Sequence, residues 1–133
     1  MYTFKKEERL CSKKLLDQLF SSGSSFLVYP FKVVYLREVL PVNYPSQVVI
    51  VVPKRRFRRA HDRNLIKRRI REVYRLHKHD LFYSFLKERN MQILLSLQYV
   101  GKEIVNFSMM DKKLQAVFRQ LNKIYSEDGH KDN

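Results

Sequence analysis

The segment 54–78 constrains the fold of this chain most strongly. It holds twelve lysine and arginine residues and two acids, so it carries a net charge of +10 out of +14 for all 133 residues. The same segment places Ile66, Ile70, Val73 and Tyr74 at the spacing of one helix face. A helix of this kind must lie at the surface of a domain, with its apolar stripe against a core and its cations in solvent.

The flanking sequence predicts a sheet for this helix to cover. Residues 31–39 alternate like a strand, with Lys32, Val34 and Leu36 on the face opposite Phe31. Residues 47–52 (QVVIVV) are apolar on both faces, which predicts a strand in the middle of the sheet. Two further segments read as strands, residues 25–28 and 92–99.

Three other segments have helical patterns. A first helix is expected after Ser12 as N-cap, ending at Gly23, with Leu16 and Phe20 on its apolar stripe. Residues 80–89 continue the basic helix or form a short one, and residues 111–125 form the last helix, capped by Ser108. The order is helix, two or three strands, helix, strand and helix, which predicts a single α+β domain over residues 1–125. Residues 126–133 are expected to be a flexible tail.

The whole-chain charge points to a polyanionic partner, because so many like charges destabilise a folded chain. Nucleic acid, an anionic membrane and an acidic protein all fit the charge alone. A membrane-surface helix needs a free apolar face, but here that face covers the sheet, so nucleic acid is favoured. The single cysteine, Cys11, indicates a reducing compartment, and neither a membrane span nor a signal peptide is recognisable. We therefore expect a cytoplasmic protein with no membrane partner.

The basic residues form an ordered row on the expected helix. Arg59, Arg63, Lys67 and Arg71 recur every four residues, about 5.4 Å per turn along the axis, which roughly matches the spacing of phosphates along a strand. Arginine forks bind phosphate oxygens with two parallel hydrogen bonds. A solvated helix face would mix charges of both signs through ion pairs one turn apart, and this one does not. The row is widened by Asn64, Arg68 and Arg75.

Residues 54–81, KRRFRRAHDRNLIKRRIREVYRLHKHDL, resemble the signature of the bacterial ribonuclease P protein subunit. The resemblance extends over roughly residues 4–125, and its most specific part is the basic helix. The positions that match are Lys54, Arg55, Ala60, Arg63, Asn64, Lys67, Arg68, Arg71 and Glu72, then Tyr74 and Arg75, with Phe4, Arg9, Leu10, Phe20 and Gly23 before them.

Two departures from the family pattern stand out. Leu65 occupies the third position of the usual arginine-asparagine-arginine triplet, so one RNA contact is absent or is supplied by a neighbour such as Arg69. The stretch 79–90 is apolar and rather long, and we expect it to extend the helix or to pack over the sheet edge.

The resemblance implies an αβββαβα fold with a mixed four-stranded sheet covered by helices, like the second domain of ribosomal protein S5. It also implies that an RNA subunit performs catalysis with Mg²⁺ bound mainly by that RNA, without an organic cofactor. The expected partners are ribonuclease P RNA and precursor tRNA, and the protein is expected to be monomeric apart from the RNA. The implied contacts to the catalytic RNA are Lys54, Arg55, Arg59, Arg63, Asn64, Lys67, Arg68 and Arg71. The implied cleft for the 5′ leader is made by Leu16, Phe20, Lys32, Val34, Leu36 and Lys67.

The sequence itself predicts no catalytic or metal-binding residue in the protein. Its four histidines lack metal-ligand spacing with acids or the cysteine, and its paired carboxylates lie in expected surface segments. Three alternatives stay open: a structural, ribosome-associated RNA-binding protein, a DNA-binding protein that uses the basic helix in a major groove, and a nuclease in its own right.

Overall fold

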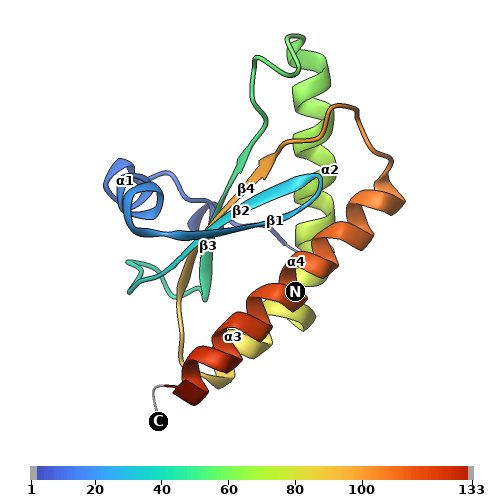
Figure 1. The fold of residues 1–133 in the computed structure, drawn as a ribbon. Helices are drawn as coiled ribbons and strands as arrows, with labels where there is room; N and C mark the ends of the chain where they lie inside the picture. Colours follow the sequence, from blue (N-terminus) through green and yellow to red (C-terminus); the bar gives the residue numbers. More distant parts are fainter. Residues whose placement is uncertain (1–2, 132–133) are drawn as a thin grey trace.

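The structure, a computed structural model, describes residues 3–131, with side chains described through Ser126. Its elements follow the predicted order of helices and strands (Figure 1). They are η1 (Lys6–Glu8), α1 (Lys13–Ser22), β1 (Ser24–Val28), β2 (Phe31–Arg37), β3 (Ser46–Val51), α2 (Ala60–Lys78), η2 (His79–Tyr83), α3 (Ser84–Glu88), β4 (Ile93–Tyr99) and α4 (Phe107–Lys131).

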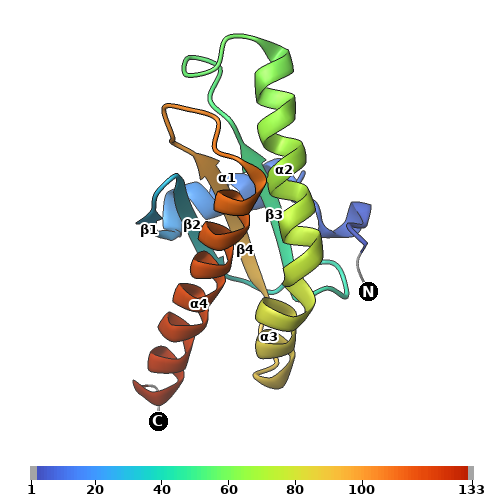
Figure 2. The ribbon, with the colours of Figure 1, turned by 90° about the vertical axis from the view of Figure 1, so that its right-hand side faces the viewer.

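The four strands form one mixed sheet in the order β1-β2-β4-β3. β1 and β4 both pair antiparallel with β2, whereas β3 pairs parallel with β4. Helix α1 lies on one face of the sheet, and α2, α3 and α4 lie on the other (Figures 1 and 2). The predicted α+β class and the mixed four-stranded sheet are thus confirmed.

The predicted place of residues 47–52 in the middle of the sheet is wrong. β3 lies at an edge, and β4 is the inner strand beside it. β3 is apolar on both sides because helices cover both faces: Val48 belongs to the core on the α2 side, and Val49 packs against the core under α1. The outer edge of β3 is partly occupied, since Leu10 N donates to Val48 O at 2.9 Å.

Two separate cores hold the helices to the sheet. The larger lies between the sheet and the helices α2 to α4, and includes Ile66, Ile70 and Phe118, each fully buried. The smaller lies under α1 and is built from Leu10, Leu19, Val34, Leu40 and Leu94. The predicted alternation in β2 is confirmed, because Phe31 and Val33 belong to the larger core and Val34 belongs to the smaller one.

Helix α1 begins and ends where the sequence predicts. Ser12 Oγ accepts a hydrogen bond from Leu15 N at 3.3 Å, and Gly23 N donates to Leu19 O at 2.8 Å. Gly23 has a φ of −74°, a conformation open to any residue. A glycine is needed there because a Cβ would overlap the Leu19 carbonyl oxygen and would lie 3.0 Å from Tyr35 O.

The expected extension of the basic helix is confirmed, because η2 and α3 continue α2 through a π-helical turn as far as Glu88. The last helix differs from its predicted bounds. Helix α4 is capped by Asn106, whose Oδ1 accepts from Met109 N at 2.9 Å, so the prediction of Ser108 as cap is wrong. α4 also continues to Lys131, past the predicted end at Tyr125. The flexibility of residues 126–133 stays a prediction, and residues 132–133 lie outside the described part.

Candidate nucleic-acid interface

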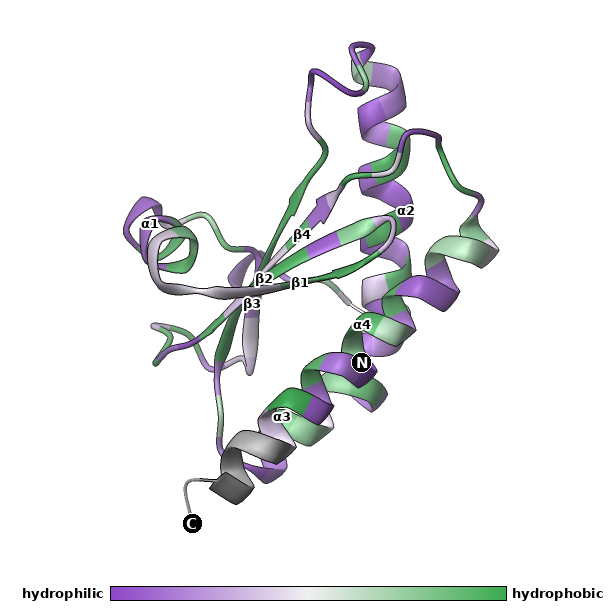
Figure 3. Ribbon diagram, in the orientation of Figure 1, coloured by the Kyte–Doolittle hydropathy of each residue, from purple (hydrophilic) through white to green (hydrophobic). Residues whose placement is uncertain are grey.

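Helix α2 presents the basic residues on the outside of the molecule. Its N-terminal half, with the loop before it, projects beyond the end of the sheet (Figures 1 and 2). Ile66, Ile70, Val73 and Tyr74 are fully buried against the sheet, as predicted. Most of the other residues of this helix are hydrophilic (Figure 3). Helical packing of one stripe therefore turns most of the cations of α2 toward solvent, and Lys78 at the end of the helix is the buried exception.

The predicted contacts to catalytic RNA lie together on α2 and on the loop that leads into it. We call these eight residues the basic face. Its exposed members are Lys54, Arg55, Arg59, Asn64, Arg68 and Arg71, and its half-buried members are Arg63 and Lys67.

Arg63 ties the loop 54–59 to α2. Its Nη1 donates to the carbonyl oxygens of Phe57 and Arg58, both at 2.8 Å. Phe57 itself is buried in the larger core and packs against Tyr99, with ring centroids 5.8 Å apart. These contacts hold the loop beside the first turn of α2, so Lys54 and Arg55 join the helical cations in one surface. Other N–H groups of the Arg63 guanidinium are left for an anion.

Arg69 has a structural partner on the other flank of α2. Its Nη1 donates to Val105 O at 2.8 Å and so fastens the β4–α4 connection to the helix. This contact weakens the case for Arg69 as the substitute for the missing triplet arginine, because part of its fork is already used. Leu65, at the triplet position, is half-buried.

One of the two acids of α2, Glu72, is paired with a neighbouring cation. Glu72 accepts from Arg75 Nη2 at 2.6 Å, and this hydrogen bond lowers the pKa of the Glu72 carboxyl below its ordinary value. Asp62 lies 3.7 Å from His61 Nδ1. The two acids therefore do not form an anionic patch that would repel a phosphate backbone from the basic face.

The predicted leader cleft is only partly assembled. Phe20 is 49% exposed, and Lys32 is exposed on the same side of the sheet as α1. Leu16 and Leu36 are half-buried around the smaller core, and Val34 is only 7% exposed within it. Val34 therefore supports α1 from below and offers little surface to a ligand.

Lys67 does not lie with the other five predicted cleft residues. It belongs to α2, which packs on the opposite face of the sheet from α1 (Figure 1). A ligand on the α1 face would have to pass around the sheet edge to reach it. In contrast, Leu27 and Gln98 pair directly with Lys32 across the strands, so they share its face. Leu27 is 63% exposed, and its place beside Lys32 follows from strand register that the sequence did not define.

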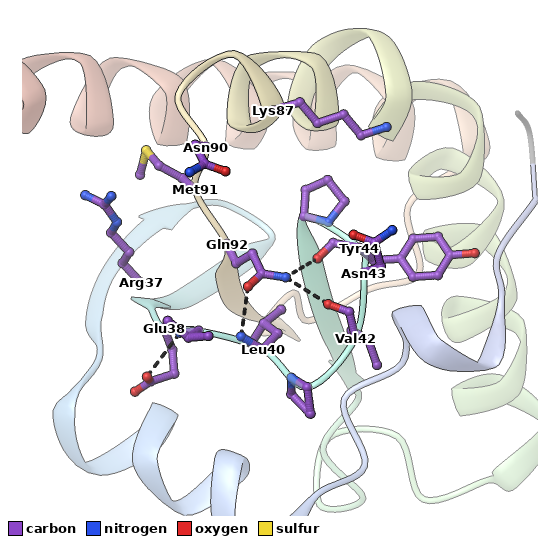
Figure 4. A pocket seen from close by; sticks show the side chains of 13 residues that line it. Arg37, Glu38, Leu40, Val42, Asn43, Tyr44, Lys87, Asn90, Met91 and Gln92 are labelled. Carbon is purple, nitrogen blue, oxygen red and sulfur yellow. Dashed lines mark hydrogen bonds between the residues drawn. The ribbon is translucent and has the colours of Figure 1, made fainter.

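A hollow of about 1030 Å³ lies away from these residues, where β2 ends and β4 begins (Figure 4). Gln92 shapes its wall: its Oε1 accepts from Leu40 N at 3.0 Å, and its Nε2 donates to Val42 O and Tyr44 O, each at 2.9 Å. The lining comes from residues 37–45, Lys87 and residues 90–92 and includes no residue of the basic face. The Gln92 amide, which is the best-defined polar group of the hollow, is already hydrogen-bonded to the loop that it holds.

Neither a metal cluster nor a membrane span is found in the described part of the chain. No group of three or more histidine, cysteine, aspartate or glutamate side chains there has a geometry that holds a metal ion. None of the helices described is both long and apolar enough to cross a bilayer.

Comparison of the sequence with known proteins identifies the family of this chain. The family model described as Ribonuclease P matches residues 4–122. The chain belongs to the ribonuclease P protein family. The ribonuclease P protein component of Porphyromonas gingivalis strain W83 is 40% identical over 111 residues, covering 83% of this chain and 80% of that protein. That of Petrotoga mobilis is 38% identical over 121 residues, covering 90% and 95%.

Solved structures of the ribonuclease P family share the fold. The ribonuclease P protein of Staphylococcus aureus superposes with a TM-score of 0.68 at 18% identity, covering 86% of this chain and 94% of that one. The protein from Thermotoga maritima superposes with a TM-score of 0.67 at 24% identity, covering 85% and 96%.

Family membership makes the chain a protein component of ribonuclease P, with the RNA of that enzyme as its partner and tRNA processing as its role.

Proposed function

We propose that the protein binds the catalytic RNA of ribonuclease P through the basic face and binds the 5′ leader of precursor tRNA on the α1 face. In this way it assists endonucleolytic removal of the leader, which yields the mature 5′ end of the tRNA. The observation that carries the proposal is the basic face, eight residues gathered on one projecting helix and its loop and backed by a fully buried stripe.

The basic face suits a phosphate backbone better than a protein or a membrane. Guanidinium groups one helical turn apart, about 5.4 Å, meet successive phosphates without reading base sequence. If six to ten phosphates are neutralised, affinity falls by roughly 10³–10⁵ between 50 and 200 mM monovalent salt. The apolar stripe of α2 is buried in the larger core, so the helix has no free apolar face for lipid.

The α1 face suits an extended single strand. Phe20 is half-exposed and offers a ring on which a base stacks, and Lys32 offers a cation for a phosphate. Both contacts are indifferent to sequence, as binding to varied leaders requires. Leu16 and Leu36 border this surface, and Val34 supports it from the core.

The protein performs no bond-breaking step in this proposal. The RNA subunit is the catalyst, and Mg²⁺ held mainly by that RNA supplies charge stabilisation at the scissile phosphate. The side chains of the protein bind and orient RNA, and no organic cofactor takes part. We further propose that the protein works in the cytoplasm and is monomeric apart from its RNA.

Reconstitution tests the proposed function. Adding the purified protein to a bacterial ribonuclease P RNA at low magnesium should restore 5′ processing of a precursor tRNA. Co-sedimentation with ribosomes without any stimulation of processing would instead favour a structural RNA-binding role.

Two variants separate the two surfaces. Arg68→Ala should weaken binding to the catalytic RNA and make the dependence on salt shallower by about one phosphate contact. Phe20→Ala should weaken binding of the precursor while leaving affinity for mature tRNA nearly unchanged. Equal losses for precursor and mature tRNA would contradict a leader site at Phe20.

A further inference from the structure

A buried ion pair joins the start of the chain to the end of α2. Glu8 is fully buried and Lys78 is 3% exposed. Lys78 Nζ donates to Glu8 Oε1 and to Thr3 O. Tyr83 OH also donates to Glu8 Oε1, at 2.6 Å, and Lys5 N donates to Glu8 Oε2 at 2.7 Å. Both oxygens of the Glu8 carboxylate therefore have partners.

The role of this ion pair is better explained by the position that it fixes for the N-terminal end of the chain than by any stability that it adds to the fold. Burial removes water from both charges, and it lowers the pKa of Lys78 although Glu8 acts against that shift. Two well-packed apolar residues would be about as stable as such a pair. What the ion pair adds is a fixed register, because Lys78 has to meet the carboxylate of Glu8. The pair therefore determines where residues 3–9, here called the N-terminal segment, lie on the molecule.

Other contacts fix the course of the N-terminal segment. The Phe4 ring packs edge-on against Tyr74, with centroids 5.6 Å apart, and Arg9 Cζ lies 5.3 Å from the Phe4 centroid. Gln47 Nε2 donates to Glu7 O at 3.0 Å, on β3. Together with the Leu10–Val48 hydrogen bond, these contacts lead the segment from the end of α2 to the outer edge of β3.

The N-terminal segment carries cations next to the basic face. Lys5, Lys6 and Arg9 are exposed, and Glu7 is the exposed acid among them, which leaves a net charge of +2. Lys78 follows Arg71 by seven residues, so both lie on one side of α2, about 10 Å apart along its axis. The segment docked on Lys78 therefore continues the row of cations on α2 beyond its last turn.

We propose that the buried Glu8 carboxylate positions Lys5, Lys6 and Arg9 as a second set of RNA contacts, which continues the basic face around the β3 edge toward α1. The partner is the phosphate backbone of the catalytic RNA, and the inference rests on the proposed function. Glu8 is a positioning residue that acts through the three cations. The N-terminal segment thus runs around the β3 edge from the α2 side of the sheet, where the basic face lies, to the α1 side, where the proposed leader surface lies.

The first test removes the three cations together. The full chain with Lys5, Lys6 and Arg9 changed to alanine is titrated with a ribonuclease P RNA transcript at several salt concentrations. The slope of log K against log salt should become shallower by about two to three. A matched control changes Lys87, Lys102 and Lys123, exposed lysines elsewhere, to alanine, for the same loss of charge. Equal effects of the two triple variants would overturn the proposal, because long-range charge alone would then explain the binding.

The second test uses the sign of a charge change. Glu8→Gln makes the protein more positive, so simple electrostatic attraction predicts tighter RNA binding. The proposal predicts weaker binding and a shallower salt slope, with no further loss when Glu8→Gln is added to the triple variant. Tighter binding, or additive losses, would refute the positioning role. The triple variant changes exposed side chains and keeps the hydrogen-bond partners of the Glu8 carboxylate, although it removes the Arg9–Phe4 contact, so it decides the proposal even where Glu8→Gln does not fold.

Arg68→Ala in the same titration separates this inference from the proposed function. If Arg68→Ala weakens binding and the N-terminal triple variant does not, the basic face stands and the second set of contacts fails. If neither variant weakens binding, the proposed RNA-binding surface on α2 fails as well.

Discussion

Replacing Gly23 with alanine gives the sharpest test of how α1 is held on the sheet. The φ of −74° is open to alanine, and by backbone entropy alone the change should stabilise the protein by about 0.4–1 kcal/mol. The structure predicts the opposite sign. A Cβ at this position would overlap Leu19 O and would lie 3.1 Å from Val34 Cγ1 in the smaller core.

The magnitude follows from two losses. The hydrogen bond from Gly23 N to Leu19 O contributes about 0.5–1.5 kcal/mol, and forcing a methyl group against backbone costs about 1–3 kcal/mol. After subtracting the entropy gain, we expect a net destabilisation of about 0.5–4 kcal/mol. With an unfolding entropy of about 2.1 cal/mol/K per residue over 133 residues, Tm should fall by about 2–14 °C.

Thermal unfolding followed by circular dichroism measures this shift. Ser22→Ala is the matched control, because Ser22 is the exposed neighbour within α1 and its change should move Tm by no more than about 2 °C. A Tm for Gly23→Ala that is unchanged or higher would refute the close approach of α1 to β2. The same variant should also weaken precursor binding, since the proposed leader surface depends on where α1 lies.

Three further predictions concern the stability of the protein and the different contributions of Arg68 and Arg69 to RNA binding. Burial raises the pKa of Tyr74 and Tyr83 above the ordinary value of 10.0, so the unfolded chain loses these protons first as the pH rises. The free energy of unfolding in urea should therefore be fully retained below pH about 10 and fall above it, by up to about 1.4 kcal/mol per pH unit for each tyrosine, less steeply in Tyr83→Phe. Arg69→Ala should lower stability by about 1 kcal/mol through the lost Val105 contact but weaken RNA binding less than Arg68→Ala does, as urea unfolding and RNA titration would reveal. Leu19→Ala should cost about 2–5 kcal/mol, because Leu19 is fully buried, and a loss below about 1 kcal/mol in urea unfolding would contradict the smaller core.

Local patterns in the sequence predict most of the elements. The apolar stripe at Ile66 and Ile70, the Ser12 cap and the alternation in β2 each depend on residues within a few positions of one another. The period of a helix or strand determines which side chains share a face, and burying the apolar face is what stabilises the element. The helical part of the basic face is predictable for the same reason, because cations that are one turn apart on a helix remain neighbours in any fold that buries its stripe.

Strand order was not predictable in this way. The apolar pattern of β3 shows that both its faces are covered, but it does not distinguish cover by helices from an inner place in the sheet. Helix ends had a similar ambiguity, since both Asn106 and Ser108 are able to cap a helix and the path of the chain selected Asn106.

What the sequence by itself determined is the chemistry of one face: a helix with a buried stripe and an outward row of arginines, matching the ribonuclease P family. Tertiary structure alone decided which distant residues join that face or are lost from it. It engaged part of Arg69 with Val105, placed Lys67 across the sheet from Phe20, and brought Glu8 to Lys78 over 70 positions of sequence. The physical reason is the range of the interactions along the sequence. Periodicity reports burial within one element, whereas contacts between elements depend on how the packed layers close around a shared core.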